Sequence, residues 1–161
     1  MTALKRMALA GSVLAAKLLL ASSAGATAGA QLVDDSGSLP YDAPLRLTWR
    51  SVAPRHGVPD KTLIGSTPLR VRLNVAPWLR HSGRIYLVLP LQPPGDLLAT
   101  WTTQGRLLSG SLRPGGRTLV YSGRLTAPFI EDQLQLSVAV NAARVQQLIT
   151  HLNFHFEIDE D

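Results

Sequence analysis

Apolar residues recur at every second position through much of the chain after residue 43. In residues 132–141 (DQLQLSVAVN) and 83–91 (GRIYLVLPL), Leu, Val and Ile alternate with other residues. A period of two matches a β-strand that has one buried face and one wet face. The same alternation, strong or weak, predicts about seven strands. They lie at 44–52, 68–75, 83–91, 97–105, 116–125, 132–141 and 151–158.

Clean alternation is typical of antiparallel sheets that are wet on one side. Because the sequence contains no long amphipathic helix to cover the apolar faces, two sheets packed together are the favoured solution. We therefore predict an all-β fold, a single antiparallel β-sandwich of the immunoglobulin-like kind, with a small β-barrel as the alternative. A short helix at 142–149 (AARVQQLI) is expected to join the last two strands.

The last predicted strand, 151–158 (HLNFHFEI), carries four large apolar residues on one face. Leaving them in water costs up to ~3 kcal/mol each, so this strand should lie at or near the centre of its sheet. The residues expected to face inward here are Leu152, Phe154, Phe156 and Ile158. In the strand 83–91, they are Ile85, Leu87, Leu89 and Leu91.

The first thirty residues have the layout of a secretory signal peptide. Lys5 and Arg6 precede an apolar run, which leads to Ala-x-Ala sites ending at Ala26 and Ala30. Lys17 interrupts the run, which is then shorter than the ~20 residues that span a bilayer. We expect residues 1–30 to be cleaved, 31–43 to form a flexible lead-in, and 44–161 to form the β-sandwich domain.

Charge and cysteine content narrow the possible functions. The whole chain has a formal net charge of +5, but Lys5, Arg6 and Lys17 fall in the leader, so the remainder is nearly balanced. This balance, together with export, argues against nucleic-acid binding. The chain has no cysteine, so its core must hold it without disulfides, which fits the bacterial periplasm or exterior.

Two histidines near the end of the chain raise the possibility of a metal site. On a strand rising ~3.3 Å per residue, His151 and His155 lie about 13 Å apart, whereas zinc ligands lie only about 2 Å from the ion. His155 and Glu157 are closer, but two ligands do not make a site. We predict no metal site, and expect the acidic end DED, 159–161, to hang free in solvent.

Three tryptophans and a glycine-rich segment are the candidate ligand contacts. Trp49 is in phase with apolar neighbours and is expected in the core. Trp78, in a loop, and Trp101, in the polar segment ATWTTQ, are the candidates for exposed, ligand-stacking rings, although core or rim packing is the favoured role for each because Trp buries so much area. Arg113 and Arg117 lie among glycines at 110–123 and offer guanidinium groups to an anion, although tight turns also explain those glycines.

No catalytic pattern is present: the sequence lacks G-x-S-x-G, H-E-x-x-H and any cysteine nucleophile. We therefore expect a non-enzyme without cofactor or metal, and without a membrane span after signal cleavage. The favoured function is that of an exported, non-catalytic protein-binding or assembly module of the bacterial envelope, periplasmic or secreted. Its partner would be another envelope or secreted protein. A structural subunit of a surface appendage and a carbohydrate-binding module are the alternatives.

Overall fold

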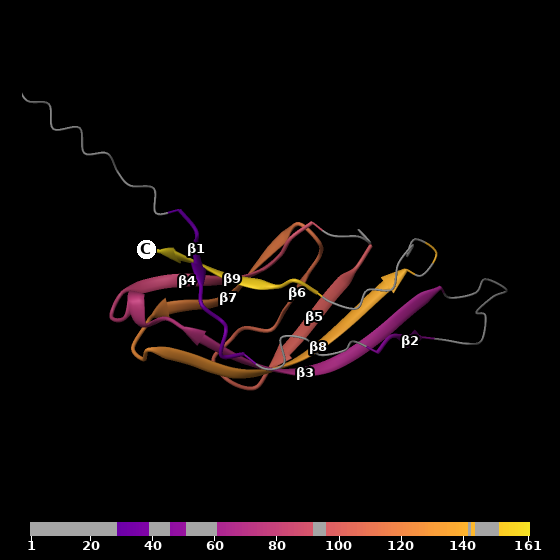
Figure 1. Ribbon diagram of the computed structural model, residues 1–161, viewed down its shortest axis with the longest axis horizontal. Coiled ribbons are helices and arrows are strands. Elements are labelled where there is room, and N and C mark those ends of the chain that lie inside the picture. The colour runs from indigo at the N-terminus through magenta and orange to yellow at the C-terminus, as the bar shows by residue number, and fades with distance from the viewer. Residues whose placement is uncertain (1–28, 39–45, 51–60, 92–95, 142, 144–151) are drawn as a thin grey trace, which may run out of the picture.

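The structure is a computed structural model that describes residues 29–38, 46–50, 61–91, 96–141, 143 and 152–161. In this part of the chain the fold is all-β, with nine strands and one short 3₁₀ turn, η1 (Ala76–Trp78) (Figure 1). The strands are β1 (Gln31–Val33), β2 (Thr48–Trp49), β3 (Thr62–Asn74), β4 (Ser82–Leu89), β5 (Leu98–Thr103), β6 (Gly110–Leu112), β7 (Gly116–Arg124), β8 (Phe129–Asn141) and β9 (His155–Glu160).

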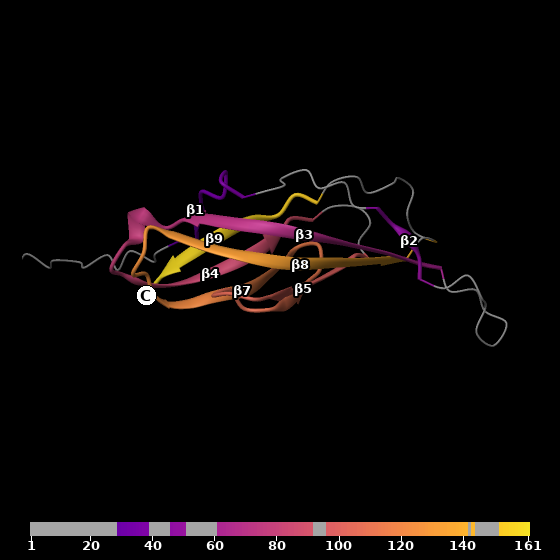
Figure 2. The same cartoon turned by 90° about the horizontal axis from the view of Figure 1, so that it is seen from below.

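The strands form two antiparallel sheets in a β-sandwich-like arrangement. One sheet has four strands in the order β1-β9-β4-β7, and the other has five in the order β2-β3-β8-β5-β6. Figure 2 shows β3 and β8 of the five-stranded sheet running along most of the length of the molecule. The edges of the sheets meet at two points, where Asn74 N–H donates to Asp34 O (2.8 Å) and Leu108 N–H donates to Val120 O (2.7 Å).

The core lies between the two sheets and is built by the alternating residues of the sequence. In β8, Leu134, Leu136, Val138 and Val140 are all buried. The predicted inner face of this strand is therefore confirmed. In β4 the prediction holds for Ile85, Leu87 and Leu89, but Leu91 is 86% exposed because it lies beyond the end of the strand.

The final strand also takes the predicted place. β9 lies between β1 and β4, and Phe156 and Ile158 point into the core. Leu152 and Phe154, which precede the strand, are partly buried against the same core. The strand starts later than predicted, at His155, and His151 lies outside the described residues.

The segment predicted as a flexible lead-in differs from expectation at its start. Residues 31–33 form β1, which pairs with β9, and Val33 is only 1% exposed. A run of three residues is too short to show alternation, so β1 could not be predicted from spacing. Residues 39–43, most of the leader and all but one residue of the predicted helix at 142–149 lie outside the described part. Within the described part, no helix is long and apolar enough to cross a membrane.

Candidate functional site

The two tryptophans expected to contact a ligand are buried. Trp101 is 2% exposed and its indole Nε1–H donates to Leu108 O at 2.9 Å, while Trp78 is 6% exposed. Trp101 shares the inner face of β5 with Ala99, because the side-chain period outweighs the polar character of its neighbours. The favoured role of Trp101 and Trp78 in core packing is therefore confirmed, and the alternative of exposed, ligand-stacking rings is wrong.

Trp49 is instead the exposed tryptophan, with 53% of its surface accessible. The expectation that Trp49 lies in the core is therefore wrong. Its phase does agree with the prediction, since it pairs with the partly buried Leu63 on the inner side of the sheet. However, β2 is a two-residue edge strand at the end of the five-stranded sheet. A residue can thus point to the inner side and still remain in contact with solvent.

Arg113 lies in the turn between β6 and β7. Its carbonyl accepts a hydrogen bond from Gly116 N–H (2.8 Å), and Gly115 has a φ of 79°. A positive φ favours glycine, so Gly115 serves the turn.

Arg117 belongs to a network of charges on the outer face of the four-stranded sheet. Its guanidinium binds both carboxylate oxygens of Asp159 (2.6 and 3.0 Å) and one oxygen of Glu157 (3.1 Å). It also stacks on the Tyr86 ring, 3.7 Å from the centroid. Glu157 in turn contacts His155 Nε2 at 3.1 Å. Because three of its guanidinium bonds go to carboxylates of its own chain, Arg117 is engaged in holding β9.

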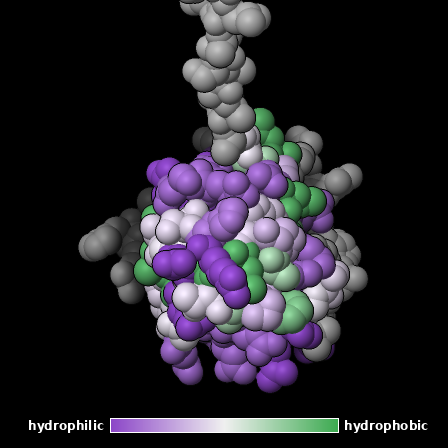
Figure 3. Space-filling view, turned by 90° about the vertical axis from the view of Figure 1, so that its left-hand side faces the viewer, coloured by the Kyte–Doolittle hydropathy of each residue, from purple (hydrophilic) through white to green (hydrophobic). Residues whose placement is uncertain are grey.

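The acidic end of the chain is therefore not free, and that prediction is wrong. Asp159 and Glu160 belong to β9, and Asp161 binds Arg84 at 3.0 Å. The hydrogen bond from Arg117 lowers the pKa of the Asp159 carboxyl below its usual value. Figure 3 shows hydrophilic side chains over most of the end of the sandwich near the C-terminus. The described residues contain no group of three metal-ligating side chains.

The outer face of the five-stranded sheet carries a groove that the sequence did not reveal. It has a volume of about 380 Å³ and crosses β2, β3, β8 and β5. Strand register places two rows of side chains along its floor. One row runs Thr48, Ile64, Ala139, Leu98, and the next runs Ser66, Ser137, Thr100.

The groove has one mainly apolar row beside one row of hydroxyls. Ser66 Oγ accepts from Gln135 Nε2 at 2.7 Å and lies 3.0 Å from Leu136 O. Such bonds fix the hydroxyl positions before any ligand arrives. Arg46 is the one ionisable residue among those that line the groove. The arrangement suits a ligand with apolar and hydrogen-bonding groups side by side, rather than acid–base chemistry.

Alternation within a strand predicts which residues face outward, but not which residues of other strands stand beside them. The groove depends on four strands in register, a non-local property.

Comparison of this chain with protein families, with curated proteins and with solved structures gives no match.

Proposed function

We propose that the chain is exported, loses residues 1–30, and acts as a non-catalytic protein-binding or assembly module of the bacterial envelope, in the periplasm or outside. We also propose that the two sheets form a β-sandwich of the immunoglobulin-like kind. The partner is another envelope or secreted protein, and it binds in the groove on the five-stranded sheet.

The groove is the observation that carries this proposal. Its floor belongs to four paired strands, so it is a rigid platform that needs little ordering on binding. The apolar and hydroxyl rows are two residues apart along the strands, or about 7 Å. A segment of a partner protein that lies along the rows buries apolar side chains on Ile64 and Leu98. It also meets the hydroxyls of Ser66, Ser137 and Thr100.

Export is tested by expressing the full chain in a Gram-negative host and sequencing the N-terminus of the product. We expect a periplasmic product that begins at Gln31. The matched control is residues 31–161 with a new initiator Met, which should remain in the cytoplasm. A full chain that keeps its leader in the cytoplasm would overturn the export proposal.

The groove is tested by filling it. Ser137→Tyr places a ring on its floor, and Ser122→Tyr places the same ring on the outer face of β7, in the other sheet. Both wild type and Ser122→Tyr should recover the same partner from periplasmic extract of the native host, and Ser137→Tyr should lose it. If all three proteins recover identical material, or none, the groove is not the binding surface.

Two alternatives remain as proposals. A structural subunit of a surface appendage would self-associate, which sedimentation of the purified mature protein at high concentration would detect. A carbohydrate-binding module would need an exposed ring, and the burial of Trp101 and Trp78 removes the two side chains first considered for it. Tryptophan fluorescence across a panel of glycans tests what remains of that alternative.

A further inference from the structure

The four hydroxyl groups that line the groove all have their protons engaged within the chain. Thr48 Oγ1–H donates to a backbone carbonyl of β3 and Thr100 Oγ1–H to one of β8, each at 3.4 Å. Ser66 Oγ–H donates to a carbonyl of β8 at 3.0 Å. Because the Ser66 proton is used there, Ser137 is the donor in the 3.3 Å contact between Ser137 Oγ and Ser66 Oγ. The hydroxyl groups therefore offer only their acceptor lone pairs to a ligand.

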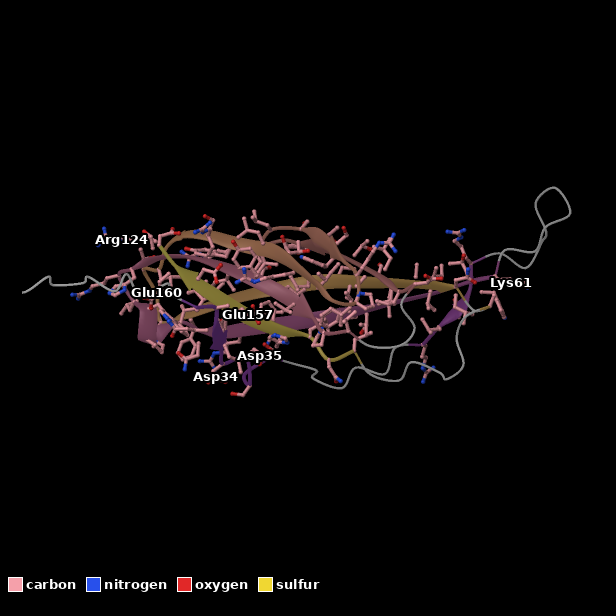
Figure 4. All side chains as sticks on the ribbon, turned by 90° about the horizontal axis from the view of Figure 1, so that it is seen from above. Asp34, Asp35, Lys61, Arg124, Glu157 and Glu160 are labelled. Atoms are coloured by element: carbon pink, nitrogen blue, oxygen red, sulfur yellow. The ribbon has the colours of Figure 1, made fainter. Side chains whose placement is uncertain are left out.

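Arg46 supplies the charged donor of the groove. Thr48 pairs with Ile64, and continuing this antiparallel register places Arg46 beside Ser66, at the end of the hydroxyl row. Arg46 is exposed and makes no ion pair with any carboxylate that the structure describes. Figure 4 shows the four labelled carboxylates toward the other end of the molecule from Lys61, which directly precedes β3. A ligand anion can therefore bind the Arg46 guanidinium without displacing a carboxylate of the chain.

The length of the hydroxyl row fits a short extended peptide. From Arg46 to Thr100 the row crosses from β2 over β3 and β8 to β5, which is three strand spacings or about 14 Å. About four residues of extended chain cover this length at ~3.3 Å each. Their backbone N–H groups match the acceptors, and their apolar side chains match the neighbouring row. A sugar also brings donors, but the residues that line the groove include no aromatic ring on which it could stack.

We infer that the groove binds an extended, apolar peptide segment that carries a carboxylate over Arg46. The backbone N–H groups of the segment donate to the hydroxyl oxygens of Ser137 and Thr100. This inference rests on the proposed binding of a partner protein in the groove, and it specifies the chemistry of the bound segment.

Variants of the mature protein test the role of charge. Arg46→Gln should weaken binding of the recovered partner about tenfold at low salt. One molar salt should remove the difference from wild type, because it screens exposed charges beyond about 3 Å. Arg70→Gln is the matched control, since Arg70 is exposed on the outer face of β3 but outside the groove. If Ser137→Tyr loses the partner while Arg46→Gln binds as wild type, the groove proposal stands and this inference fails. If Ser137→Tyr also keeps the partner, the proposed function itself fails.

A second pair of variants tests the acceptor role of the hydroxyl row. Thr100→Val keeps the shape of the side chain and removes its oxygen, so the N–H group above it loses its acceptor. Binding of the partner should weaken about threefold or more. Thr100→Ser keeps the oxygen and should bind nearly as wild type. Unchanged or tighter binding by Thr100→Val would overturn the inference.

Synthetic probes identify the source of the carboxylate. They are acetyl-Ala-Leu-Ala-Leu with a free carboxyl terminus, the same peptide as a C-terminal amide, acetyl-Ala-Leu-Ala-Glu amide, and tetragalacturonate. NMR of the ¹⁵N-labelled mature protein follows the backbone amides of Ser137 and Ala139. We expect a carboxylate peptide to bind about tenfold or more tightly than the neutral amide, and comparison of the two carboxylate peptides separates a chain terminus from a side chain. Equal binding of the neutral peptide, no binding of any peptide, or tighter binding of tetragalacturonate would overturn the inference.

Discussion

The outer faces of the two sheets both meet solvent, but they carry different kinds of polar residues. The four-stranded sheet covers its outer face with paired charges, in which Arg117 joins β7 to Glu157 and Asp159 of β9. Over the groove, the five-stranded sheet presents hydroxyls and apolar side chains, with Ser66 bound to Gln135. The four-stranded sheet has its cations occupied by carboxylates of the same chain, and the groove on the five-stranded sheet has an uncharged floor, although an Arg72–Glu131 ion pair (3.1 Å) lies elsewhere on that face. Polar residues on an outer face can therefore either hold the strands of their own sheet together or remain available to a binding partner.

The largest effect should come from the core beneath both faces. Phe156→Ala should lower the free energy of unfolding by roughly 3–5 kcal/mol, because it removes a ring that is 4% exposed. Phe154→Ala should cost less, since Phe154 is only partly buried. Urea unfolding of both variants checks this order. A reversed order would mean that β9 does not supply the core as described.

The next effect should distinguish the two faces. Arg117→Ala should cost about 1–2 kcal/mol, since it leaves Asp159 and Glu157 without their shared partner on a face that is only partly exposed. Gln135→Ala, on the other face, should stay within about 0.5 kcal/mol. Arg117→Met keeps the stem over Tyr86 and separates packing from charge. Equal costs for Arg117→Ala and Gln135→Ala would remove the distinction between the faces.

Acid should weaken the charged face selectively. The folded-state pKa of Asp159 lies below the ordinary value of 3.8. Its contribution to stability is therefore present above that value, and is lost as the pH falls through the lowered pKa. The stability difference between wild type and Arg117→Ala should stay constant from about pH 7 to 5 and shrink below about pH 4. Chemical unfolding at each pH measures this difference, and a constant value down to pH 2 would contradict the role given to Asp159.

The smallest effect should come from His155. Its contact is with Glu157, whose carboxylate Arg117 also holds, so the loss of His155 leaves Glu157 with a charged partner. His155→Ala should change the free energy of unfolding by less than about 0.5 kcal/mol at pH 7. It should also leave the metal content unchanged, as measured by elemental analysis. A loss of bound metal together with stability would restore the metal-site hypothesis.

The alternation of apolar and polar residues predicted the long strands because one face of each strand is buried. Leu134 to Val140 in β8 and Phe156 and Ile158 in β9 could be assigned to the core from spacing alone. The same rule failed at Trp49, since phase tells which side a residue faces and not whether the opposite sheet reaches that far. At Trp101 the spacing holds, since the side chain lies inward although its neighbours Thr100 and Thr102 are polar.

Contacts between strands distant in sequence could not be predicted. Asp159 and Asp161 looked like a fraying tail because their partners, Arg117 and Arg84, lie more than forty residues earlier in the chain. The groove was missed for the same reason, since Ile64, Ala139 and Leu98 become neighbours only through register. Each of these features depends on the strand order and register of the sheets, which the spacing of residues within one strand does not determine.

The place of β9 between β1 and β4 has a consequence for the timing of folding. β1 is the first described strand in the chain and β9 the last, and Gln31 pairs with Ile158. Until residues 155–160 have been synthesised, the four-stranded sheet has no strand to join β1 to β4. Pairings of such large sequence separation form slowly. The four-stranded sheet therefore stays incomplete until β9 has been made, so the described fold forms only after synthesis has passed residue 160.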